Sequence, residues 1–144
     1  MRVAAAKERK GRLVLVVEDE DDMRTLMHEL LDLAGYDVEL AADGQEGIER
    51  LQAKGFDLVL LDLAMPRVDG WGVLAWLRGH SEPPPVIVLT GVGNVETLAR
   101  CLDEGAALAF AKPLAFGELL EACETLTTPR ARKTSDAVAP PGRG

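Results

Sequence analysis

Five short apolar runs alternate with five segments of helical periodicity, and this alternation limits the folds that are open to the chain. Three of the runs are rich in Val, Leu and Ile without polar interruption, which is typical of strands covered on both faces. Another run alternates polar and apolar residues, as an edge strand does, and the last run is weaker. The predicted strands are residues 13–17, 37–41, 58–61, 86–89 and 106–111.

Apolar residues recur at three- and four-residue spacing after each run, so each of these segments is predicted to be a helix. Gly35 ends the first helix, Gly79 ends the third, and Asn94 caps the fourth, while the second follows Asp43 and Gly44. The apolar stripes of the five helices are Met23, Leu26, Met27, Leu30, Leu31 and Ala34; Ile48 and Leu51; Trp71, Leu74 and Leu77; Val95, Leu98, Ala99 and Leu102; and Phe116, Leu119, Leu120, Cys123 and Leu126.

Five strand–helix units in a row predict a doubly wound α/β domain with a five-stranded parallel sheet and helices on both faces. This domain is expected to cover residues 12–126. Residues 1–11 are a basic segment without periodicity, and residues 127–144 are polar with several Pro and Gly. Both are predicted to be flexible.

The charge of the chain argues against a nucleic-acid partner. The net charge is −8, and residues 13–126 hold 22 acidic residues against 7 basic ones, which would repel a phosphate backbone. Every apolar run is far too short to cross a membrane, so no membrane association is expected. Cys101 and Cys123 are predicted to be buried free thiols, which fits a reducing cytoplasm.

Polar residues directly follow four of the apolar runs. Glu18 and Asp19 follow the first run, Asp62 the third, Thr90 the fourth and Lys112 the fifth. The carboxyl ends of parallel strands meet at one edge of a sheet, where open α/β folds bind their ligands. Each residue alone has a plain structural explanation as a helix cap, a turn residue or a surface side chain. Their joint occurrence predicts a site at that edge.

Three carboxylates in one place point to a divalent cation, because ionised carboxylates raise one another's pKa. Mg²⁺ takes such oxygen ligands together with phosphate oxygens. At the end of the central strand, Asp62 is suited to attack phosphorus as a nucleophile, with Lys112 binding an oxygen of the transferred group. Phosphoryl transfer to Asp62 in the presence of Mg²⁺ is therefore the predicted chemistry.

Four spaced motifs closely resemble the receiver domains of two-component response regulators. They are VVEDEDDMR, LVLLDLAMPRVDGW, VIVLTG and AFAKPL, in this order along residues 12–126. The resemblance implies a flavodoxin-like fold with strand order 2-1-3-4-5 and five helices. It also implies that Asp62 is phosphorylated by the phosphohistidine of a sensor histidine kinase or a histidine phosphotransferase.

The resemblance assigns a role to each matching residue. Asp19, Asp62 and the backbone carbonyl of Ala64 are implied to bind Mg²⁺ directly, and Glu18 to act through water. Thr90 and Lys112 are implied to hold oxygens of the phosphoryl group, Gly91 to leave room for it, and the Lys112–Pro113 bond to be cis.

One position departs from the family pattern. The family usually carries Tyr or Phe three residues before the Lys, where the ring turns inward as the Thr moves. Here that position is Ala109, and the aromatic residue is Phe110. Successive strand residues face opposite sides, so Phe110 is predicted to be a core residue and not a substitute for the missing ring.

Three alternatives remain open from the sequence. A haloacid-dehalogenase-like phosphohydrolase also uses an Asp nucleophile and Mg²⁺, but needs a second Asp where this chain has Ala64. The domain is also compatible with a module of a longer regulator or hybrid kinase, or with a degenerate partner-binding module. The preferred interpretation is a single-domain regulator, a monomer or weak dimer, which catalyses only its own phosphorylation and dephosphorylation. It would contact its target through the face of the fourth helix, fifth strand and fifth helix, or through the first helix.

Overall fold

A computed structural model of the chain describes residues 11–65, 67–91, 94–113 and 115–128. Its centre is a five-stranded sheet in the order β2-β1-β3-β4-β5, in which every pair of neighbours is parallel. The predicted topology is therefore confirmed. The strands are β1 (Leu13–Val17), β2 (Asp37–Ala41), β3 (Leu58–Asp62), β4 (Val86–Thr90) and β5 (Leu108–Ala111).

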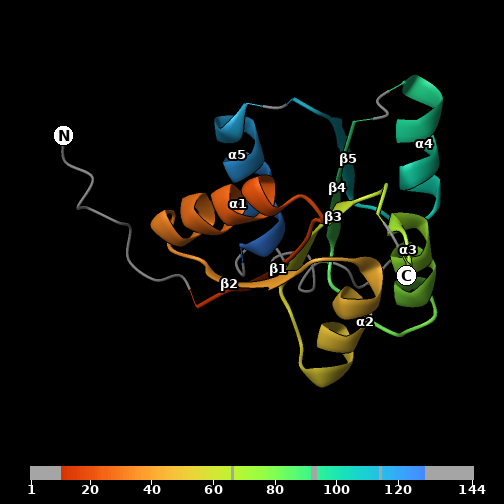
Figure 1. Cartoon of the computed structure of the whole chain (residues 1–144), viewed down its shortest axis with the longest axis horizontal. Coiled ribbons are helices and arrows are strands. Elements are labelled where there is room, and N and C mark those ends of the chain that lie inside the picture. Colours follow the sequence, from red (N-terminus) through yellow and green to blue (C-terminus); the bar gives the residue numbers. More distant parts are fainter. Residues whose placement is uncertain (1–10, 66, 92–93, 114, 129–144) are drawn as a thin grey trace, which may run out of the picture.

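The five helices cover both faces of the sheet, with α1 and α5 on one side and α2, α3 and α4 on the other (Figure 1). This three-layer arrangement is what right-handed strand–helix–strand crossovers produce when the strand order reverses once. The helices are α1 (Asp21–Leu33), α2 (Gly44–Ala53), α3 (Gly70–Arg78), α4 (Val95–Asp103) and α5 (Phe116–Thr127).

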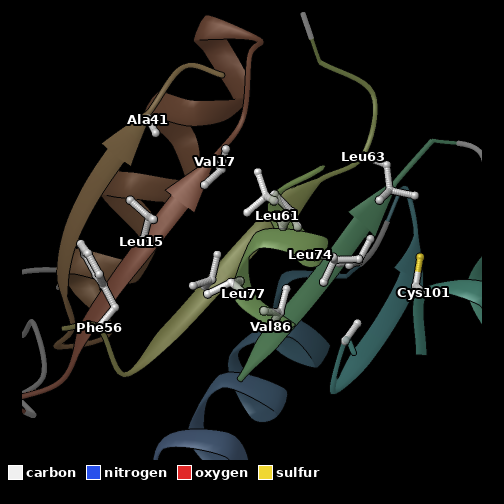
Figure 2. Close-up of a cluster of buried hydrophobic side chains, with 14 residues drawn as sticks. Leu15, Val17, Ala41, Phe56, Leu61, Leu63, Leu74, Leu77, Val86 and Cys101 are labelled. Carbon is white, nitrogen blue, oxygen red and sulfur yellow. The ribbon is translucent and has the colours of Figure 1, made fainter. Parts of the chain in front are cut away.

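Alternate residues of the buried strands feed two separate cores. Leu15 and Val17 point toward α2, α3 and α4, whereas Val14 and Val16 of the same strand point toward α1 and α5. Figure 2 shows the first of these clusters, where Leu74 and Leu77 of α3 pack on the sheet. Because both faces are covered, the central strands are apolar at every position before the final Asp62 of β3 and Thr90 of β4, as the sequence pattern indicated.

Glycine ends the first helix as predicted. Gly35 adopts φ +102°, and the next two amide groups close the last turn: Gly35 N–H donates to Asp32 O at 3.0 Å and Tyr36 N–H to Leu31 O at 3.1 Å. A residue with a side chain is strained at this φ, so glycine suits the position.

The strand boundaries differ from the predicted ones at the functional edge. Asp62 and Thr90 are the last residues of β3 and β4, so both side chains are placed by the sheet and not by the following loops. The strand β5 begins at Leu108, two residues later than predicted. Ala106 is not in the strand because its N–H donates to Cys101 O at 2.9 Å and completes the cap of α4.

The predicted apolar stripe of α4 does not face the core. Val95 is 81% exposed and Leu102 is 50% exposed, and Cys101 is the buried residue of this helix. On the same side α4 contacts α3, where the guanidinium of Arg100 stacks on the ring of Trp71 at 4.0 Å. Part of the apolar surface of α4 thus remains exposed to solvent.

Residues 1–10 and 129–144 lie outside the described residues, so the predicted flexibility of both ends stays a prediction. In the part of the chain that the structure describes, every helix is too short or too polar to cross a membrane. Cys101 and Cys123 are buried free thiols, as predicted.

Candidate functional site

The carboxyl edge of the sheet brings together side chains from four strands. Asp62 and Thr90 end β3 and β4, Glu18 follows β1, and Lys112 follows β5. Two backbone hydrogen bonds extend the sheet by one residue at this edge: Glu18 N–H donates to Ala41 O at 3.0 Å, and Lys112 N–H to Thr90 O at 2.8 Å. The sheet therefore fixes the backbone of Glu18 and Lys112 as firmly as that of the strand residues.

Three carboxylates gather at this edge. Glu18, Asp19 and Asp62 each offer one oxygen, and these oxygens lie within 4.8 Å of one another. Glu18 is 5% exposed and Asp62 is 7% exposed, whereas Asp19 is exposed to solvent. The site thus has a buried floor made by two carboxylates and an open rim made by the third.

The ammonium group of Lys112 lies between the two buried carboxylates. Its Nζ is 3.1 Å from Oε1 of Glu18 and 3.8 Å from Oδ1 of Asp62. The other oxygen of Glu18 accepts a hydrogen bond from the backbone N–H of Glu20 at 3.2 Å. Lys112 therefore offsets part of the negative charge and is already within reach of the Asp62 carboxylate.

The surroundings of Asp62 raise its pKa to about 6. Burial is the largest cause, since it disfavours the ionised form, and the neighbouring charge of Glu18 adds to it. Lys112 lowers the pKa and Asp19 raises it further. A cation that joined the three carboxylates would remove the repulsion and favour the ionised, nucleophilic form of Asp62.

The donor set suits Mg²⁺. Carboxylate oxygens are hard ligands, and oxygens bound to one Mg²⁺ at 2.0–2.1 Å lie at most about 4.2 Å apart. The present spread of up to 4.8 Å is close to that limit, so the spacing suits one ion that is shared by these carboxylates directly or through water. The open rim at Asp19 leaves space for water or a phosphoryl oxygen among the remaining ligands.

Three further predicted features lie around this cluster. Thr90 is fully buried beside Lys112, Ala64 is exposed in the loop after β3, and the Lys112–Pro113 bond is cis, as predicted. At Gly91 a Cβ atom would meet no atom within 4 Å, so there is open space next to Thr90. The roles of Thr90, Ala64 and Gly91 stay predictions.

The side chains of β5 face as predicted. Ala109 packs with the core under α2, α3 and α4, and Phe110 packs with the opposite core under α1 and α5. Phe110 therefore cannot fill the position that an aromatic residue at 109 would occupy. The methyl group of Ala109 leaves β5 without a ring on the α4 side.

Two glycines near the site make close backbone contacts that the sequence did not predict. A Cβ atom on Gly70 would lie 2.4 Å from Asp62 O, and one on Gly44 would lie 1.9 Å from Val68 O. Both glycines allow the loop after Asp62 to fold tightly against its neighbours. The adjacent Asp43 and Asp69 cap α2 and α3, but the close backbone contacts of the two glycines depend on the folded loop.

An ion pair also ties this loop to α2. Arg67 donates from Nε to Oδ2 of Asp43 at 3.0 Å and from its terminal nitrogen to Oδ1 at 2.9 Å. Asp43 also caps α2 by accepting from Glu46 N–H at 2.9 Å, and these hydrogen bonds hold its pKa below the usual range. The Arg67–Asp43 ion pair therefore fixes the loop after β3 to the start of α2.

Comparison with known proteins gives a consistent result. Residues 14–124 match the model of the response regulator receiver domain. The chain is 35% identical over 113 residues to the transcriptional regulatory protein CusR of Escherichia coli K12, covering 78% of this chain and 50% of that protein. It is 38% identical over 124 residues to the response regulator MprA of Mycobacterium tuberculosis H37Rv, covering 86% of this chain and 53% of that protein.

Solved structures agree with this match. The response regulator TrrA of Thermotoga maritima, solved in complex with Mg²⁺ and BeF, is 30% identical with a TM-score of 0.72, covering 80% of this chain and 98% of that one. The Francisella response regulator 1452 receiver domain is 26% identical with a TM-score of 0.79, covering 81% and 97%. The chain spans about half the length of the curated relatives that it matches. With its sheet order, its edge cluster and these similarities, the chain belongs to the response regulator receiver domain family.

Proposed function

We propose that residues 12–126 act as a phosphorylation switch in which Asp62 accepts a phosphoryl group from the phosphohistidine of a sensor histidine kinase or histidine phosphotransferase. One observation carries the proposal: a buried carboxylate at the end of the central strand lies beside an ammonium group and two further carboxylates. A structural role alone does not explain this grouping, because burying Glu18 and Asp62 together costs free energy.

Asp62 is the nucleophile of this reaction. One of its carboxylate oxygens forms a bond to phosphorus while the bond from phosphorus to the donor imidazole nitrogen breaks. The imidazole leaves with the electron pair and takes a proton from solvent. The product is an acyl phosphate on Asp62, and the strand holds its carboxyl group in a fixed direction toward the edge of the sheet.

Lys112 and Thr90 stabilise the transferred group. The ammonium group, now 3.8 Å from Asp62 Oδ1, binds an oxygen of the phosphoryl group and offsets its charge. Thr90 ends the neighbouring strand, and its hydroxyl group donates to another phosphoryl oxygen. The resulting change in the contacts of Thr90 passes to α4, which begins a few residues later.

Glu18, Asp19, Asp62 and the carbonyl of Ala64 are the residues that hold Mg²⁺, with Glu18 acting through water. When bound, the ion offsets the negative charge of the carboxylates and of the incoming phosphoryl group. The three carboxylates fit it through the chemistry and spacing of their oxygens.

The phosphodonor docks in an apolar groove between α1 and the start of α5. Lys112 lines both this groove and the acidic cluster, so a helix seated here carries its phosphohistidine to Asp62. Leu26 is 47% exposed at the groove, and exposed acidic residues on both helices favour a partner helix with basic residues around its apolar face. The groove is lined by Met23, Leu26, Met27, Leu30, Leu89, Lys112, Pro113, Phe116 and Leu119.

The output surface is the face of α4, β5 and α5, with α1 as the other candidate. Val95 and Leu102 leave exposed apolar surface on α4 for a protein target or for a weak dimer of this chain. The acidic body disfavours nucleic acid as a direct partner. Two free thiols fit a cytoplasmic protein.

This switch modifies only itself and does not turn over external substrates. The phosphohydrolase alternative receives no support, since the matching family is the receiver domain and Ala64 stands where a hydrolase needs its second Asp.

Intact-mass spectrometry tests the proposal directly. The purified chain is incubated with Mg²⁺ and phosphoramidate, a small donor with a phosphorus–nitrogen bond. The expected result is a gain of one phosphoryl group that needs Mg²⁺ and is absent in Asp62→Asn. The matched control Asp57→Asn changes a carboxylate at the opposite end of the same strand, where it accepts from Leu13 N–H, and should still be phosphorylated. An unchanged mass gain in Asp62→Asn would disprove the assignment.

A further inference from the structure

Arg24 is a partly buried arginine next to the acidic cluster, with a side chain that is 19% exposed. It lies near the start of α1, where its neighbours Asp21, Asp22 and Thr25 are all exposed. Its guanidinium turns back along the helix toward the end of β1 instead of extending into water. Long charged side chains are seldom buried without a partner, so its contacts identify what it holds.

The guanidinium bridges the two ends of the loop that carries Asp19. One terminal nitrogen donates to the backbone carbonyl of Glu18 at 2.8 Å, and the other donates to Oδ1 of Asp21. Between these two anchors lie Asp19 and Glu20. The planar, always charged fork of arginine suits such a double contact better than the single flexible ammonium of lysine.

The bond to Glu18 O has a direct consequence for Asp19. The carbonyl belongs to the peptide group that joins Glu18 to Asp19, and because a peptide group is planar, holding its oxygen fixes the orientation of the whole unit. Glu18 N–H is held by Ala41 O at 3.0 Å. Arg24 thus completes the restraint on the backbone from which the exposed Asp19 carboxylate reaches the cluster.

We propose that Arg24 is a positioning residue for the divalent-ion site: it fixes the Glu18–Asp19 peptide and so presents Asp19 to the ion without touching the ion itself. This inference rests on the proposed Mg²⁺-dependent function. Residues that orient metal ligands in this way typically change metal affinity about 10–100-fold when they are replaced.

Charge alone and a positioning role predict opposite changes in Mg²⁺ affinity when Arg24 is removed. Arg24 carries a positive charge close to the site, so its removal should by charge alone strengthen the binding of a cation. If the residue orients Asp19, its removal should weaken binding despite the lost repulsion. The direction of the change therefore separates a positioning role from a merely structural or electrostatic one.

Isothermal titration calorimetry of the metal-free chain with MgCl₂ measures this direction. We expect Arg24→Met to raise the Mg²⁺ Kd about tenfold, in line with other supporting residues. Arg24→Lys keeps the charge and one donor, and its Kd should lie between those of the wild type and Arg24→Met.

Arg50→Met is the matched control. Arg50 lies in the last turn of α2, at the end of the helix away from the carboxyl edge of the sheet, and pairs with Glu39 at 3.4 Å and with Glu46 at 3.5 Å. Its replacement changes the net charge by the same amount as the replacement of Arg24. Its Kd should stay within about twofold of the wild type. Urea unfolding in EDTA shows which variants are folded during the titration, and the Lys variant serves if the Met variant is not.

A Kd for Arg24→Met equal to or lower than that of the wild type would overturn the inference. An equal loss of affinity in Arg50→Met would also overturn it, because the loss would then not depend on the position of Arg24 beside the Glu18–Asp19 peptide. If the wild-type chain itself binds no Mg²⁺, the proposed function fails and not only the role of Arg24.

Discussion

The carboxyl group of Asp62 is costly to ionise inside the folded protein. It is 7% exposed and faces Glu18 and Asp19, so its pKa rises to about 6 from an ordinary value of 3.8. The folded protein therefore favours the protonated form of the Asp62 carboxyl group. The stability that Asp62 contributes is present below about pH 4 and is lost as the pH rises through about 6, because the buried carboxylate then ionises.

Asp62→Asn should consequently stabilise the metal-free protein at neutral pH. We expect the free energy of unfolding in EDTA to rise by about 2 kcal/mol at pH 7.5 and the gain to shrink toward zero near pH 4. Urea denaturation at both pH values measures this difference. Asp57→Asn at the other end of β3 provides the control for the loss of one carboxylate outside the acidic cluster.

Saturating Mg²⁺ should reverse the order of the two proteins, since only the wild type keeps the complete carboxylate set. A stabilisation of Asp62→Asn that is the same at both pH values would contradict the account of the buried charge.

At the scale of secondary-structure elements, α2 and the loop after β3 pack together as one unit. The first residue of α2, Gly44, faces the backbone of Val68 so closely that no side chain fits between them. The Arg67–Asp43 ion pair closes the same contact from outside, and it holds Arg67 at φ +64°, a backbone conformation that a residue with a side chain adopts at some cost. The loop that carries Ala64 is thereby fixed to a neighbouring helix.

Gly44→Ala should separate these two elements. A Cβ atom 1.9 Å from Val68 O forces the loop or the helix to move, and we expect a loss of about 2–3 kcal/mol in the free energy of unfolding. Gly55→Ala is the matched control because a Cβ atom there meets nothing within 4 Å, so its effect should stay within about 0.5 kcal/mol. Equal stability of the two variants would show that the contact is unimportant.

Local patterns in the sequence predict the elements well where packing is two-sided. Uninterrupted apolar runs predict β1, β3 and β4, and because strand residues alternate, the opposite faces of Ala109 and Phe110 follow from the sequence as well. The orientation of α4 does not follow from its apolar stripe, because Cys101 is the buried residue of this helix while Val95 and Leu102 are exposed. The hydrogen-bond partners of Arg24 and Arg67 could not be predicted from the sequence either, because they depend on the folded conformation of the loops around these residues.

At the scale of the whole molecule, the three proposed tasks fall on separate places: phosphorylation on the acidic cluster, donor docking on the groove and target binding on the exposed side of α4. The cluster lies at the carboxyl edge of the sheet, and the groove opens beside it through Lys112. The helix α4, on which Val95 and Leu102 are exposed, lies on the side of the sheet opposite to α1 and α5 (Figure 1). A donor bound in the groove therefore leaves the α4 surface free for a target.

Leu26→Asp should accordingly impair one route to phosphorylation and spare another. The charge enters the apolar groove, so transfer from a histidine kinase that phosphorylates the wild-type chain should slow at least about tenfold. Phosphorylation by phosphoramidate, which needs no docking surface, should keep its rate. Val95→Asp on α4 is the control and should leave both rates unchanged, while equal slowing with both donors would contradict a docking role for the groove.

The most direct test of the central claim is to locate the phosphoryl group on the chain. The protein is phosphorylated with phosphoramidate and Mg²⁺, reduced with borohydride, and digested for tandem mass spectrometry, because reduction converts an aspartyl phosphate into homoserine. The account predicts homoserine at position 62, dependent on Mg²⁺ and absent from the untreated protein. Homoserine at position 19, a reduced glutamyl phosphate at position 18, or phosphorylation that persists without a divalent ion would contradict it.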